Sequence, residues 1–124
     1  GLRTRNITNI GAYYTSDRAT LGAFDSLGGI AGTYKTPALY AVASGVMTNT
    51  QSTGPYRGAG RPEAAYIIES MIDAAARELK MDSVEIRRRN TIPADAMPFK
   101  TGLTFTYDSG DFLKNLDDCV DMAD

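Results

Sequence analysis

The chain has 124 residues, of which 43% are hydrophobic and 23% charged, and its formal net charge is −2. This composition is typical of an ordinary globular domain, and the slight acidity argues against nucleic acid as a main partner, because phosphate binding usually requires a basic excess. Histidine is absent and Cys119 is the one cysteine, which excludes a Cys/His metal site and an internal disulfide. No apolar run approaches the roughly 18 residues of a membrane span, and we expect a cytoplasmic protein.

The first part of the chain is rich in glycine and in strand-forming residues. Residues 7–14 alternate loosely and predict a strand that Gly11 interrupts. Residues 21–34 hold four glycines, too many for a regular helix, so a loop is expected there. Residues 39–50 alternate more clearly and predict a second strand, in which Gly45 indicates a bulge or a close backbone approach.

The apolar spacing then changes to the period of a helix. Residues 62–80 predict a helix that begins at a proline, with Met71 and Ile72 on its buried face. Asp73 and Arg77 lie one turn apart on this helix and are expected to pair.

Capping signals mark two further helices. The stretch from Asp82 to Glu85 resembles a capping box and opens a short helix that runs to about Arg89. Its cluster Arg87–Arg89 is interpreted as a solvated face with local ion pairs, against a subunit or cofactor contact. Residues 103–107 predict an edge strand, and Asp111 caps a last helix. Together these elements predict an α+β fold, a small mixed sheet with helices packed on one face, as part of a larger domain.

Glycine, proline and charge are most concentrated in the stretch GPYRGAGRPE, residues 54–63. It lies between a predicted strand and the amino end of a predicted helix, where free backbone N–H groups favour anions. Arg57 and Arg61 add planar donors suited to oxyanions. The residues alone leave two interpretations: a site for a phosphate, carboxylate or metal-oxo group, or a tight turn whose arginines bind carboxylates of the protein itself.

A longer stretch carries a family resemblance. Residues 48–90, which run from TNTQSTGPYRGAGRPE to EIRRRN, closely resemble the large, molybdenum-binding subunit of the molybdenum hydroxylases. This family contains xanthine dehydrogenase, aldehyde oxidase and aerobic carbon monoxide dehydrogenase. The segments NIGAY at 9–13, GTYKTPALY at 32–40 and YDSGDF at 107–112 resemble it as well.

The resemblance implies that residues 1–124 are a single fragment of the molybdopterin-binding domain of a much longer oxidoreductase subunit. The full-length enzyme is expected to hold molybdenum–molybdopterin, in its cytosine dinucleotide form, and to work with iron–sulfur and FAD subunits or domains. The family's general base belongs to a Gly-Glu motif outside this chain. The isolated fragment is therefore expected to be inactive and to hold no cofactor.

The resemblance also assigns site residues. Arg57 matches an arginine beside the molybdenum and is the expected catalytic and cofactor-binding residue. Gly58 and Ala59 match positions whose backbone approaches the cofactor, while Tyr56 and Ala59 would line the substrate pocket. A packing role that fixes the loop is the competing interpretation for Tyr56. No protein ligand to the metal is expected.

Two departures from the family pattern bear on the substrate. In xanthine dehydrogenases the position of Ala59 is aromatic and packs against a flat purine, and in true carbon monoxide dehydrogenases the position of Gly58 is a copper-binding cysteine. We therefore expect a homologue of the carbon monoxide dehydrogenase type that oxidises a different small molecule, an aldehyde or an aromatic N-heterocycle. The alternatives are a non-catalytic binding or assembly module of the same ancestry and a phosphate-binding domain unrelated to molybdenum.

Overall fold

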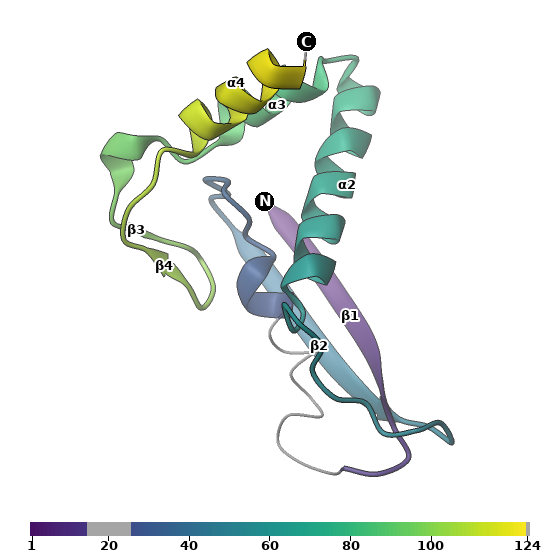
Figure 1. Cartoon of the computed structure of the whole chain (residues 1–124). Helices are drawn as coiled ribbons and strands as arrows, with labels where there is room; N and C mark the ends of the chain where they lie inside the picture. Colours follow the sequence, from purple (N-terminus) through teal and green to yellow (C-terminus); the bar gives the residue numbers. More distant parts are fainter. Residues whose placement is uncertain (15–25, 124) are drawn as a thin grey trace.

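The structure is a computed structural model that describes residues 1–14 and 26–123. Strands β1 (Leu2–Gly11) and β2 (Leu39–Met47) pair in parallel, with Leu2 opposite Leu39 and Gly11 opposite Met47 (Figure 1). The first strand begins earlier than residue 7, where it was predicted to start, and ends at Gly11. The α+β class is confirmed, but the described strands are divided between two separate two-stranded sheets.

The irregularity expected at Gly45 lies on the opposite strand. The register of the pair shifts between Asn9 and Gly11, so the bulge belongs to β1. Gly45 instead provides the close approach, because a Cβ atom there would lie 3.2 Å from Cγ2 of Ile10.

The core surrounds a segment that was predicted to be a loop. Residues 21–25 of this segment lie outside the described residues, and residues 26–29 are helical. Two of their glycines allow close packing: a Cβ at Gly28 would lie 3.0 Å from the Phe105 ring, and one at Gly29 would lie 3.1 Å from Cβ of Ala64. Ile30 follows and is fully buried. The loop prediction was therefore wrong here, because these glycines make room for neighbouring elements and do not break the helix.

Helix α2 (Arg61–Leu79) runs from the end of the connection that follows β2 (Figure 1). Its buried residues are Ala64, Ile68 and Ala76. Met71, predicted to be buried, is 54% exposed, and Ile72 is half-buried. The apolar spacing thus identified the helix correctly but extended its buried face too far.

The remaining elements follow the predicted caps. Helix α3 (Ser83–Asn90) begins at Asp82, whose side chain accepts hydrogen bonds from the backbone N–H groups of Val84 and Glu85, each at 2.9 Å. Helix α4 (Phe112–Ala123) begins beside Asp111, which accepts from Lys114 N at 3.0 Å. Between them lie a 3-10 turn (Ala94–Ala96) and the antiparallel strands β3 (Phe99–Lys100) and β4 (Thr106–Tyr107). Among the described residues, no helix combines the length and apolarity needed to cross a membrane.

Candidate functional site

The glycine-rich stretch forms two successive tight turns directly before α2. Ala59 N donates to Tyr56 O at 2.8 Å, and Arg61 N donates to Gly58 O at 3.0 Å. Gly58, Ala59 and Gly60 all have positive φ, at 94°, 42° and 88°. Positive φ is uncommon for alanine and carries strain, which clusters at functional sites. A Cβ at Gly58 would lie 2.8 Å from the Pro62 ring, so this path of the backbone requires glycine at 58.

The amino end of α2 has no side-chain cap. Gly60 occupies the N-cap position, and no side chain there accepts from the first turn. The second residue of the helix is a proline, Pro62, and Glu63 is the acidic residue of the first turn. Arg61 N donates to Gly58 O, Pro62 has no N–H, and Ala64 N donates to Gly60 O at 3.0 Å, so the N–H of Glu63 is the first-turn donor left for an acceptor from outside.

The two arginines of this stretch bind no carboxylate among residues 1–14 and 26–123. Arg57 is exposed and forms no ion pair there. Arg61 donates from Nη1 to the carbonyl of Gly58 at 3.3 Å, which braces the turn. The interpretation in which both arginines neutralise internal carboxylates is therefore not supported. Tyr56 is 89% exposed, so its ring packs against little of this chain.

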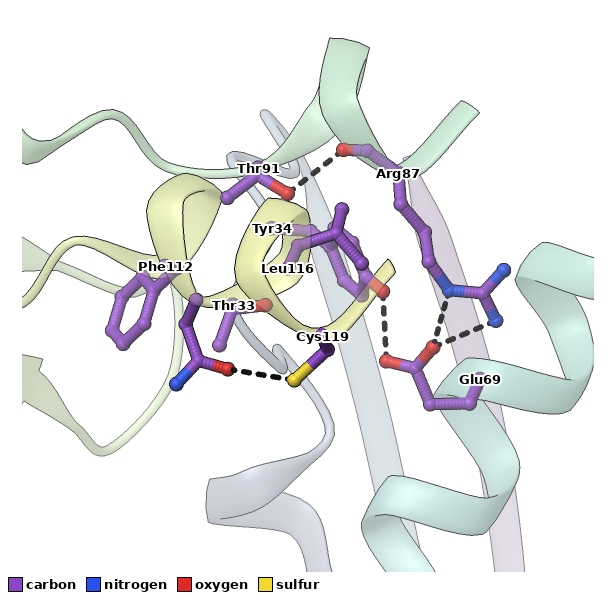
Figure 2. Close-up of a pocket in the computed structure, with 9 residues that line it drawn as sticks. Thr33, Tyr34, Glu69, Arg87, Thr91, Phe112, Leu116 and Cys119 are labelled. Atoms are coloured by element: carbon purple, nitrogen blue, oxygen red, sulfur yellow. Dashed lines mark hydrogen bonds and ion pairs between the residues drawn. The ribbon is translucent and has the colours of Figure 1, made fainter. Parts of the chain in front are cut away.

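A second polar region lies around the middle of α2, at Glu69 and Asp73, and the sequence did not reveal it. A cavity of about 250 Å³ separates this region from α4. Figure 2 shows Phe112, Leu116 and Cys119 of α4 lining it together with Tyr34, Glu69 and Arg87.

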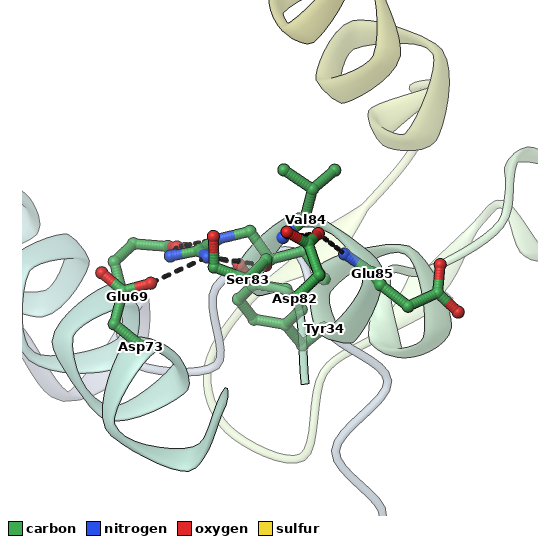
Figure 3. Close-up of polar contacts among 8 residues, drawn as sticks. Tyr34, Glu69, Asp73, Asp82, Ser83, Val84 and Glu85 are labelled. Atoms are coloured by element: carbon green, nitrogen blue, oxygen red, sulfur yellow. Dashed lines mark hydrogen bonds and ion pairs between the residues drawn. The ribbon is translucent and has the colours of Figure 1, made fainter. Parts of the chain in front are cut away.

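Arg87 is the centre of this region, and Figure 2 shows its side chain beside Glu69. Its guanidinium contacts Glu69 Oε2 from Nε and Nη2 and Asp73 Oδ1 from Nη1, each at 2.9 Å. Figure 3 shows Tyr34, Glu69 and Asp73 of the same region near the start of α3. Nη1 also donates to the carbonyl of Ser83 at 2.9 Å, and Tyr34 Oη donates to Glu69 Oε1 at 2.7 Å. We call Tyr34, Glu69, Asp73 and Arg87 the Arg87 network.

The electrostatics of the Arg87 network indicate a structural role. Burial lowers the pKa of Arg87, but its hydrogen bonds to Asp73 and Glu69 outweigh this and raise the pKa overall. Burial, and the hydrogen bond to Glu69, raise the pKa of Tyr34. Each charge has a partner, so the cavity beside the network offers a ligand no free charge. We interpret the cavity as a gap in the packing between helices and not as a reaction site.

The network also corrects two sequence predictions. Asp73 pairs with Arg87 instead of Arg77, because α3 folds back beside α2. A local ion pair is confirmed for Arg89 with Glu85, one turn apart, at 2.6 Å. Arg88 instead pairs with Asp117 of α4 at 2.7 Å, across 29 positions of the sequence. The solvated-face interpretation is wrong for Arg87, whose side chain is 16% exposed. Sequence spacing gives no signal for such long-range pairs.

Metal ligation by protein side chains was also considered. In the described part of the chain, no group of three or more His, Cys, Asp or Glu residues could hold a metal ion. Cys119 is exposed and free. The glycine-rich turn before α2 is therefore the arrangement best suited to an anionic ligand or cofactor.

Comparison with known proteins places this turn in a family context. The family model described as the molybdopterin cofactor-binding domain matches residues 1–91. The carbon monoxide dehydrogenase large chain of Hydrogenophaga pseudoflava is 36% identical over 126 residues, covering 100% of this chain and 16% of its own length. The chain thus spans about one sixth of the curated relatives it matches.

Solved structures agree with the sequence matches. The reconstituted CO dehydrogenase from Oligotropha carboxidovorans superposes with a TM-score of 0.83 and 31% identity, over 96% of this chain and 15% of that one. Quinoline 2-oxidoreductase from Pseudomonas putida 86 superposes with a TM-score of 0.81 and 32% identity, over the same shares of each chain. The described residues therefore have the fold of the matching part of these two enzymes.

Proposed function

Since this chain belongs to the molybdopterin cofactor-binding domain family, we propose that it is a single fragment, residues 1–124, of the large subunit of a molybdenum hydroxylase. We propose further that residues 56–60 form one wall of the active site. The single observation that carries the site assignment is an exposed Arg57, without an ion pair among the described residues, on a strained turn at the amino end of α2, which has no side-chain cap.

The residues of this turn fit an anionic cofactor. Molybdopterin carries phosphate and the molybdenum carries oxo groups, so the cofactor presents negative charge to the protein. The absence of a side chain at Gly58 and the sharp path of the backbone at Ala59 let a ligand approach the main chain closely. When bound, the metal centre supplies the redox chemistry. The role of the protein is to position reactants and to stabilise charge.

Arg57 is the residue proposed to stabilise charge. Its guanidinium has no internal partner among the described residues, so its donors are available to substrate or to charge that develops during the reaction. Fixed donors at such positions typically contribute a few kcal/mol, about 10²-fold to 10³-fold in rate. Tyr56 and Ala59 would border the substrate pocket beside it, where the exposed ring of Tyr56 is free to meet a ligand.

The proposed substrate class is based on two small residues of the turn, Gly58 and Ala59. Ala59 presents only a methyl group, which leaves the pocket without a stacking aromatic at this position. The similarity to quinoline 2-oxidoreductase supports an aromatic N-heterocycle, and an aldehyde is the second candidate. Gly58 argues against carbon monoxide: a copper-binding side chain at 58 would meet the Pro62 ring in this backbone conformation.

The parent enzyme completes the proposal. We propose the cytosine dinucleotide form of the cofactor, iron–sulfur and FAD subunits or domains as partners, a cytoplasmic location, and an inactive isolated fragment. The inactivity of the isolated fragment is supported by its length, because the chain spans about one sixth of relatives such as a carbon monoxide dehydrogenase large chain.

The test uses the full-length enzyme with Arg57→Ala, assayed on aldehydes and N-heterocycles. Turnover is expected to fall about 10²-fold to 10³-fold while molybdopterin content stays near that of the wild type. Arg77→Ala is the matched control, because Arg77 is exposed near the other end of α2 and forms no ion pair among the described residues. Unchanged turnover in Arg57→Ala would refute the catalytic role. A wild-type protein without cofactor or turnover would favour the binding or assembly module.

A further inference from the structure

The connection between β2 and α2 contains the proposed site, and its first half lies along the end of β1. Thr48 N donates to Gly11 O at 3.1 Å, Ala12 N donates to Thr50 O at 3.0 Å, and Thr53 N donates to Ile10 O at 3.3 Å. Residues 48–53 belong to no strand, yet these bonds hold them beside residues 10–12. The end of β1 thus determines where the connection begins its course toward Arg57.

The side chain of Asn9 adds a second attachment. Its Oδ1 accepts from Gly11 N at 2.8 Å and from Thr48 Oγ1 at 2.6 Å, and its Nδ2 donates to Thr50 Oγ1 at 2.9 Å. One amide therefore joins the bulge of β1 to two residues of the connection. This arrangement uses the donor and acceptor capacity that distinguishes asparagine from an apolar residue of similar size.

Gly11 provides the closest contact. It is buried, with φ at 83°, and a Cβ there would lie 2.4 Å from Gln51 O and 2.5 Å from Ser52 Cα. Both atoms belong to the backbone, so any side chain at residue 11 would displace the connection itself. Gly54 offers the opposite case within the same connection, because a Cβ there would meet nothing within 4 Å.

We propose that Asn9 and Gly11 are positioning residues that place Arg57 in the active site. Arg57 lies within the turns from Tyr56 to Arg61, and only Gly54 and Pro55 separate these turns from the attachment that ends at Thr53. If that attachment shifts, the backbone that carries the guanidinium shifts with it. This inference rests on the proposed function, since it assigns Arg57 a reaction to serve.

The experiment is a double-mutant cycle of Asn9→Ala and Arg57→Ala in the full-length enzyme. Asn9→Ala is expected to lower kcat/KM about 10-fold, because small displacements of a catalytic group are costly, with molybdopterin content unchanged. If Asn9 acts through Arg57, the double variant loses no more than Arg57→Ala alone. Asn9→Asp should recover most of the activity, because its Oδ1 still accepts from Gly11 N and Thr48 Oγ1, and its second oxygen can accept from the Thr50 hydroxyl.

A second experiment compares kcat/KM of the Gly11→Ala and Gly54→Ala variants. The first is expected to lower kcat/KM more than 10-fold and the second to leave it unchanged. Should Gly11→Ala fail to fold, the Asn9 cycle still decides. Asn6→Ala is the control for Asn9, since Asn6 lies on the same strand but bonds Ser26 and Thr4, away from the connection.

The outcomes separate the two proposals. The positioning role would be overturned if the losses in kcat/KM of Asn9→Ala and Arg57→Ala multiply in the double variant. It would also be overturned if Asn9→Ala is as active as the wild type. An Arg57→Ala variant with full activity would instead overturn the proposed function.

Discussion

Two arginines near α2 have opposite surroundings. Arg87 contacts two carboxylates and a carbonyl at 2.9 Å, and its side chain is 16% exposed. Arg57 is exposed, forms no ion pair within the described residues, and lies on a backbone with three successive positive φ angles. A charge with a full set of partners stabilises the fold, whereas an unpaired charge on a strained turn is available to a ligand.

The two helix starts repeat this contrast. Asp82 closes the amino end of α3 with two hydrogen bonds, while Gly60 leaves the amino end of α2 without a side-chain acceptor. The difference is informative because both helices begin in the same chain. A side chain therefore caps α3, whereas the helix that follows the proposed site begins without one.

Loss of Arg87 should have the largest effect on stability. Arg87→Met leaves Glu69 and Asp73 without their cation and is expected to lower the free energy of unfolding by about 2 kcal/mol, less than for a fully buried pair because both carboxylates are partly exposed. Chemical denaturation of the 124-residue chain measures it. Arg89→Met, which breaks an exposed pair one turn apart, is the control and should cost about 0.5 kcal/mol or less. Equal losses would remove the distinction between the two kinds of ion pair.

A side chain at Gly58 should cost less, through strain. Gly58→Ala is expected to lower the free energy of unfolding by about 1.5 kcal/mol, because φ is positive and the new Cβ meets the Pro62 ring. Gly54→Ala in the same connection should cost much less, since its Cβ would face open space. Adding Pro62→Ala to Gly58→Ala should recover part of the loss. If the two glycine variants are equally stable, the turn does not require glycine.

Removal of the α3 cap should cost about 1 kcal/mol. Asp82→Ala deletes the acceptor for Val84 N and Glu85 N, and thermal unfolding followed by circular dichroism measures the result. Asp95→Ala is a suitable control, because the short turn that contains Asp95 has no side-chain cap. No change in Asp82→Ala would mean that a helix start in this chain tolerates an open end without cost.

The smallest expected effect is on the pH dependence of stability, and it is absent near neutral pH. The unfolded chain releases the Tyr34 proton near pH 10, whereas burial and Glu69 hold it in the folded chain at higher pH. The unfolded state then binds fewer protons, so stability falls as pH rises above about 10 and is independent of this group below that. Tyr34→Phe should make the decline shallower, with Tyr107 contributing the remainder, since burial raises its pKa as well. An identical slope in the variant would show that the Arg87 network does not retain the Tyr34 proton.

Local signals in the sequence were sufficient for much of the fold. The caps at Asp82 and Asp111 and the proline at 62 located three helices, and alternation located β2. The helical turn at 26–29 could not be predicted, because the close packing of Gly28 against Phe105 depends on residues far along the chain.

The glycine turn and the Arg87 network also differ in how much of each could be predicted from the sequence. The glycine turn could be located because glycine, proline and arginine are concentrated in ten consecutive residues, 54–63. Coordinates were required to show that Arg57 forms no ion pair among the described residues and that Ala59 has a positive φ like its two glycine neighbours. The Arg87 network was missed because it joins residues that no local pattern relates, from Tyr34 to Arg87.

The most direct test of the central claim is to locate the metal. Diffraction from crystals of the full-length enzyme, recorded on both sides of the molybdenum absorption edge, gives the position of molybdenum without reference to any assumed site. In the difference between the two anomalous maps, to which only molybdenum contributes strongly, the proposed function predicts one peak beside the backbone of Gly58 and Ala59, within reach of the Arg57 side chain. A peak at the cavity beside the Arg87 network, or none near residues 56–60, would contradict it.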